Sequence, residues 1–212
     1  MTMLFAVLAV IVQVLVIGFI LSKYGIQILN QEKRGKSLFL ILGLVLSAAG
    51  MNLLMVIREY TWLQVANQIL MFTLLIILAG IDYRSHRIPN RLLLAGLIIR
   101  TVLILTEILL LPETWKQIVV FSVISMVISL LFMLLLTFLT KHGIGYGDVK
   151  LFAWLGFCLG LKETYYILFY STLLAAVVGI FLMVMKKTDR KARLPFAPFV
   201  LGGYYAVFWM LS

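Results

Sequence analysis

The sequence predicts an all-α polytopic membrane protein, a bundle of about eight helices, two of them short, with both termini facing outward. Its composition is 64% hydrophobic and only 12% charged, which excludes an ordinary soluble domain. Several apolar stretches reach roughly 20 residues, enough to cross a hydrocarbon core about 30 Å thick as helices. Short polar loops separate them, and lipid favours helices because every backbone polar group must be satisfied internally.

The apolar segments follow one another from the first residues to the last. The first segment has no basic residue before its apolar run, as a cleavable signal peptide would, so we expect a retained helix. We expect one membrane domain over residues 1–212, with no soluble domain. The six long segments are Thr2–Ser22, Ser37–Ile57, Leu63–Tyr83, Leu92–Leu111, Ile118–Thr140 and Tyr165–Met185, and the two short ones are Val149–Leu161 and Pro198–Leu211.

Basic residues are distributed unequally between the two sides that these alternating segments define. One side has only Arg58, Lys116 and Lys162. Since basic residues accumulate in cytoplasmic loops, the opposite side is predicted to face the cytoplasm. This explains most of the net charge of +10, so we expect anionic headgroups and no nucleic acid as partners. The cytoplasmic set is Lys23, Lys33, Arg34, Lys36, Arg84, Arg87, Arg91, Lys141, Lys150, Lys186, Lys187, Arg190, Lys191 and Arg193.

Two of the eight acidic residues stand at the predicted cytoplasmic edge of apolar segments. Asp82 ends the third segment, and Asp148 closes the run Gly143-Ile144-Gly145-Tyr146-Gly147-Asp148. Asp148 alone could be a helix cap. Glycines just before an acid also allow close backbone approach, which a cap does not require. The pair at one depth therefore favours function over capping.

Two carboxylates about 3 Å apart cannot both ionise easily, so one keeps a proton while the other accepts one. Such a dyad can activate water against a peptide carbonyl, the charged aspartate taking the proton and the neutral one polarising the oxygen. No cofactor or metal is needed. Cys158 has no cysteine partner within the chain for a disulfide or a cysteine zinc site, so packing is its expected role.

The motifs around both aspartates resemble the type IV prepilin peptidases, membrane aspartyl proteases of the GxGD class. Asp82 precedes Ile88-Pro89-Asn90, and Gly145-Tyr146-Gly147-Asp148 leads into Val149-Lys150-Leu151. Pro195-Phe196-Ala197-Pro198-Phe199 resembles the entry to the family's last helix, so the resemblance covers roughly Leu63 to the C-terminus.

The resemblance implies that Asp82 and Asp148 are the catalytic pair and that Gly145 and Gly147 shape the second motif. It implies removal of a basic leader from prepilins or pseudopilins that carry an N-terminal hydrophobic helix. The expected location is a bacterial cytoplasmic (inner) membrane, multi-pass, with the active site on the cytoplasmic side. Many bacterial members also carry a cysteine-rich zinc insertion and methylate the new N-terminus. The loop Lys23–Lys36 is short and holds no cysteine or histidine, so we expect a peptidase without methyltransferase activity.

Several other polar residues also have expected roles. Pro89 and Asn90 would fix the turn after Asp82, and Lys150 belongs to the second motif. Possible substrate contacts are His86, His142 and Pro195, although solvated interface histidines are the simpler interpretation of the first two. Arg100 and Glu107 share a helix face and could pair, directly or through a bridging group. Gln64, Asn67 and Gln68 are expected to face the bundle.

Three other functions remain open. A proton-coupled transporter would use intramembrane carboxylates too, but acids at the midplane are its expected feature. An intramembrane protease of the signal-peptide-peptidase or presenilin type is disfavoured by the Ile88-Pro89-Asn90 turn. A non-catalytic assembly scaffold could retain the same motifs, and the presence of both aspartates counts against it.

Overall fold

The computed structural model describes residues 11–20, 49–50, 61–141, 143–185 and 194–211. These residues form helices and short connections without a strand, so the predicted all-α class is confirmed. The predicted segments at 2–22 and 37–57 lie mostly outside the described residues, although 11–20 is helical. From residue 61 onward the elements are α3 (Trp62–Ser85), α4 (Asn90–Leu110), the 3-10 turn η2 (Pro112–Thr114), α5 (Trp115–Leu139), α6 (Tyr146–Leu159), α7 (Leu161–Val184) and α8 (Ala197–Leu211).

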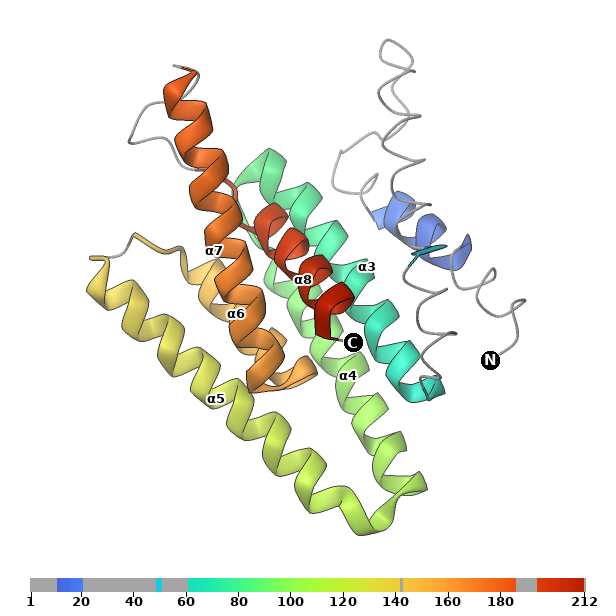
Figure 1. Ribbon diagram of the computed structural model, residues 1–212. Coiled ribbons are helices and arrows are strands. Elements are labelled where there is room, and N and C mark those ends of the chain that lie inside the picture. Colours follow the sequence, from blue (N-terminus) through green and yellow to red (C-terminus); the bar gives the residue numbers. More distant parts are fainter. Residues whose placement is uncertain (1–10, 21–48, 51–60, 142, 186–193, 212) are drawn as a thin grey trace.

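Four of these helices, α3, α4, α5 and α7, are long and apolar enough to cross a membrane, which confirms a polytopic architecture. The helices alternate in direction (Figure 1). Therefore α3, α5 and α7 end, and α4, α6 and α8 begin, at one end of the bundle, called here the aspartate end. The two short helices, α6 and α8, therefore begin at that end and extend into the bundle.

The core forms around α3. Its segment from Met71 to Ala79 is buried on all sides, and its apolar pattern fits that environment because a helix buried all round carries no polar face. Helix α8 packs against both α3 and α7, and α6 packs against α5 and α7 (Figure 1). Two glycines permit these approaches. A Cβ atom at Gly156 would lie 2.6 Å from the Ser125 carbonyl oxygen, and one at Gly203 would lie 2.7 Å from that of Ile167.

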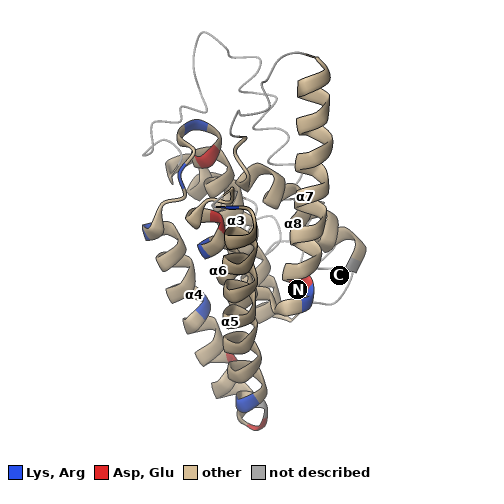
Figure 2. Ribbon diagram, turned by 90° about the vertical axis from the view of Figure 1, so that its left-hand side faces the viewer, with Lys and Arg blue, Asp and Glu red and all other residues tan. Residues whose placement is uncertain are grey.

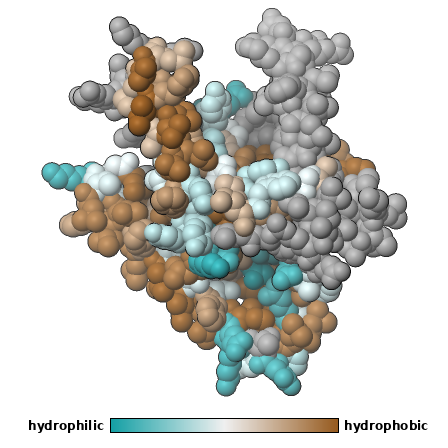
Figure 3. All heavy atoms as spheres, viewed as in Figure 1, coloured by the Kyte–Doolittle hydropathy of each residue, from teal (hydrophilic) through white to brown (hydrophobic). Residues whose placement is uncertain are grey.

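The outer faces of α4, α5 and α7 are exposed and apolar, as lipid contact requires, and Figure 3 shows hydrophobic side chains over α5 and the C-terminal part of α7. In the described part of the chain, charged residues gather mainly where helices begin and end (Figure 2). An exception lies within α4, where Arg100 Nη1 and Glu107 Oε1 form a partly buried ion pair at 3.0 Å. The predicted pairing of these two residues is confirmed, and it is direct.

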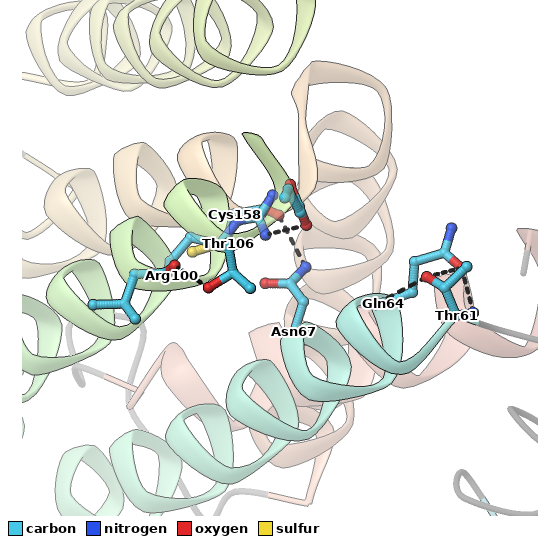
Figure 4. Close-up of polar contacts among 8 residues, drawn as sticks. Thr61, Gln64, Asn67, Arg100, Thr106 and Cys158 are labelled. Atoms are coloured by element: carbon cyan, nitrogen blue, oxygen red, sulfur yellow. Dashed lines mark hydrogen bonds and ion pairs between the residues drawn. The ribbon is translucent and has the colours of Figure 1, made fainter. Parts of the chain in front are cut away.

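Polar side chains of α3 join neighbouring helices. The Asn67 amide donates to the Cys158 carbonyl oxygen at 3.1 Å (Figure 4), and the Tyr204 hydroxyl donates to the Gln68 side chain. The prediction for Gln64 was wrong, because this side chain is exposed. Instead it accepts from the Thr61 backbone N–H at 2.9 Å, while the Gln64 N–H donates to the Thr61 hydroxyl, forming a capping box that starts α3.

Candidate active site

Asp82 lies in the last turn of α3 and is buried, with 6% of its surface exposed. Its Oδ2 accepts a hydrogen bond of 3.0 Å from the backbone N–H of Ala197, the first residue of α8. A helix leaves its first N–H groups without intrahelical partners, so one of them is available to a carboxylate. The α8 N-terminus therefore both satisfies and orients Asp82, and this donor could not be identified from the sequence motifs.

Asp148 lies in the first turn of α6, outside the four candidate spans. The helix begins at Tyr146 with Gly145 as N-cap, three residues earlier than the apolar pattern predicted. Asp148 therefore lies within the helix and does not precede it as a cap. The pKa of Asp148 is raised from its ordinary 3.8 to about 7, mainly by burial and to a lesser degree by the charge of Asp82. A hydrogen bond with the Gly145 backbone acts in the opposite direction and lowers this pKa.

Both aspartates lie at the aspartate end, although 66 positions separate them in the sequence (148 minus 82). They lie close enough for the charge of Asp82 to act on Asp148. Because the second carboxyl holds its proton up to about pH 7, one ionised and one protonated carboxyl can coexist at neutral pH. The arrangement can therefore offer a base and an acid to a substrate between them.

The turn after α3 packs directly on the glycine motif. A Cβ atom at Gly147 would lie 3.3 Å from the Ile88 Cβ, so this close approach favours glycine. Asn90 begins α4 directly after Pro89, and its Oδ1 accepts a hydrogen bond of 3.2 Å from Lys150 Nζ. These contacts join the two motifs and hold the ends of α3 and α6 together.

The remaining predicted site residues are less closely tied to the pair. His86 is exposed and ends α3 in the left-handed conformation, with φ of 50°, and its N–H donates to the Asp82 carbonyl oxygen at 2.8 Å. No hydrogen bond of its ring is found in the described part of the protein. Pro195 is partly buried just before α8, and His142 lies outside the described residues.

A cavity of about 390 Å³ opens beside Asp148 between α5 and α7. It shares four residues with a larger cavity of about 840 Å³ that reaches the opposite end of these helices. The shared residues are Phe132, Met133, Tyr165 and Leu168. The two neighbouring cavities, called together the passage, follow α5 and α7, are mostly apolar, and include the Asp148 carboxyl group in the lining of the smaller one.

A model of the type IV leader peptidase family matches residues 69–180, which include both aspartates, the Ile88-Pro89-Asn90 turn and the glycine motif before Asp148. A prepilin leader peptidase/N-methyltransferase of Bacillus subtilis strain 168 is 30% identical over 141 residues, or 66% of this chain and 54% of that protein. The proteins of the same name from Xanthomonas campestris and Aeromonas salmonicida are 40% and 37% identical over 70 residues, or 32% of this chain and 24% of theirs.

The chain thus spans about half of the first relative and a quarter of the other two. No solved structure gave a match. The family model nevertheless covers more than half of this chain, and the matched region carries the sequence motifs that meet at the aspartate end. The chain therefore belongs to the type IV leader peptidase family.

Proposed function

We propose that this protein is a membrane-embedded aspartyl endopeptidase that removes the basic leader from type IV prepilins or pseudopilins. The observation that carries the proposal is the pairing of a buried Asp82, held by the Ala197 N–H, with an Asp148 whose pKa is raised to about 7. Ionised Asp82 takes a proton from the attacking water, and protonated Asp148 polarises the scissile carbonyl. The proton then passes to the leaving amine.

The passage between α5 and α7 suits the hydrophobic helix that follows a prepilin leader. Its apolar lining would accept that helix from the bilayer and bring the cleavage site to Asp148. The leader would then extend beyond the aspartate end, which we propose faces the cytoplasm of a bacterial inner membrane. The basic residues Arg84, Arg87 and Arg91 and Lys141 at this end support that orientation.

We propose further that the product is not methylated. The relatives named above are called peptidase and N-methyltransferase, but the sequence of this chain from 23 to 36 contains no cysteine or histidine with which to build a zinc insertion. Cleavage therefore rests on the two aspartates alone, and we expect no metal to be required.

The test is cleavage of a prepilin by purified protein in nanodiscs, with the product mass determined in the presence of a methyl donor. We expect a leaderless, unmethylated product from the wild type and none from Asp82→Asn or Asp148→Asn. Glu113→Gln is the matched control, since it neutralises an exposed carboxylate at the opposite end. Leader removal by either aspartate variant would refute the mechanism, and an added methyl mass would refute only the absence of methylation.

A further inference from the structure

A groove separate from the passage lies between α4, α5 and α6. It has a volume of about 420 Å³ and is lined along its length by Leu97, Met126, Leu130 and Trp154. At the aspartate end its mouth is formed by Asn90, Arg91 and Lys150. The groove is therefore apolar along its length and cationic at one end.

The mouth is built to attract an anion. Arg91 and Lys150 are both exposed, and the bond from Lys150 to Asn90 places its ammonium group over the start of α4. Helix α4 has no acidic residue in its first turn and no side-chain cap, so its positive end is not neutralised there. None of the residues that line the groove is acidic.

The walls indicate what the anion is attached to. α4 and α5 are candidate membrane spans whose outer faces are exposed and apolar, so the groove opens where acyl chains would lie. A free inorganic anion would use the mouth and leave the apolar length empty. We propose that the groove binds an anionic phospholipid, with its phosphate at Arg91 and Lys150 and one acyl chain along Leu97 and Leu130 to Trp154.

Such a lipid would lie beside the contact between the two motifs and would not contact the two aspartates. Lys150 follows Asp148 by two residues in α6, and its partner Asn90 follows the Ile88-Pro89 turn. Headgroup charge would thus act on the contact that links α4 to α6. The binding itself does not depend on the proposed peptidase activity and can be measured without a substrate.

Trp154 provides a direct probe, because it lines the groove and is buried from water. We would replace the other tryptophans, Trp62, Trp115 and Trp209, with phenylalanine and reconstitute the full chain in nanodiscs. Brominated phosphatidylglycerol, diluted in unbrominated phosphatidylcholine, should quench Trp154 more strongly than brominated phosphatidylcholine diluted in unbrominated phosphatidylglycerol. Equal quenching would overturn the preference for an anionic lipid, and absence of quenching by both would mean that something else, such as a second copy of the chain, covers the groove.

Charge and groove can be separated with matched variants. Arg91→Gln should reduce the preference for the anionic lipid about fivefold, whereas Arg87→Gln, at an exposed arginine that does not line the groove, should leave it nearly unchanged. Ala153→Phe should fill the groove and prevent quenching, and Ala176→Phe on α7 is its control. Equal effects of the two arginine variants would indicate general surface attraction and overturn the site. Retained quenching in Ala153→Phe would do the same.

Discussion

Replacing Asp82 with asparagine tests whether the two carboxyl groups sense each other. The substitution removes the negative charge that helps to raise the pKa of Asp148, while the asparagine oxygen can still accept from the Ala197 N–H. The difference between 3.8 and about 7 corresponds to about 4 kcal/mol between the ionised and protonated forms. Because burial is the larger of the two causes that raise this pKa, losing the Asp82 charge should remove only part of the difference.

We therefore expect the pKa of Asp148 in Asp82→Asn to fall below about 7 and to stay above 3.8. Infrared titration of the carboxyl signal in nanodiscs measures it, with the Asp82→Asn, Asp148→Asn double variant subtracted to isolate Asp148. In Glu113→Gln, which removes a distant charge, the pKa should stay near that of the wild type. If Asp82→Asn leaves the pKa of Asp148 unchanged, the two groups are not coupled and the dyad mechanism loses its electrostatic basis.

Three further results are expected. First, if protonated Asp148 is the acid, the cleavage rate should fall about tenfold per pH unit above a pKa of about 7, because this carboxyl ionises there. Initial-rate assays at constant ionic strength measure this, and a rate that keeps rising to pH 9 would contradict the role. Second, Gly147→Ala places a Cβ atom 3.3 Å from Ile88 Cβ, an atom that no side-chain rotation can move away. We therefore expect the cleavage rate to fall up to about 100-fold, while the amount of folded protein in detergent changes little. Third, Gly203→Ala places a Cβ atom 2.7 Å from the Ile167 carbonyl oxygen and should lower the free energy of unfolding by about 1–3 kcal/mol, as measured by titration with a denaturing detergent. The control Gly179→Ala should be neutral or slightly stabilising, because its nearest neighbour is the end of a flexible leucine side chain at 3.6 Å.

Much of the helical architecture could be predicted because lipid imposes a single strong constraint on the sequence. The lengths of the apolar runs predicted the first and last residues of α3, α4 and α5 to within about three residues. It failed where polar residues open a helix. Helix α7 begins at Leu161 rather than Tyr165, because its first turn carries Lys162 and Glu163, and an acid there is favourable near a helix N-terminus. Hydropathy alone cannot recognise such a turn.

The error at Gln64 had a recognisable signal. Thr61 and Gln64 have the spacing of a capping box, which explains a polar side chain at a helix start without requiring a buried partner. The close approaches of Gly156 and Gly203 had no comparable signal. They depend on which helices become neighbours, and periodicity within one helix does not determine that.

The two candidate aspartates could be singled out from local motifs, but the contacts that hold them in place come from residues distant in sequence. The Ala197 N–H holds Asp82, Ile88 packs on Gly147, and Asn90 accepts from Lys150. Each contact joins the start of one helix to a motif on another, at the end where the alternating helices bring α3, α4, α6 and α8 together. A change in the length of α6 or α8 at its far end would leave these contacts in place, whereas an insertion between Pro195 and Ala197 would move the donor away from Asp82. The position of the α8 N-terminus is therefore as much a part of the proposed catalytic apparatus as the glycine motif.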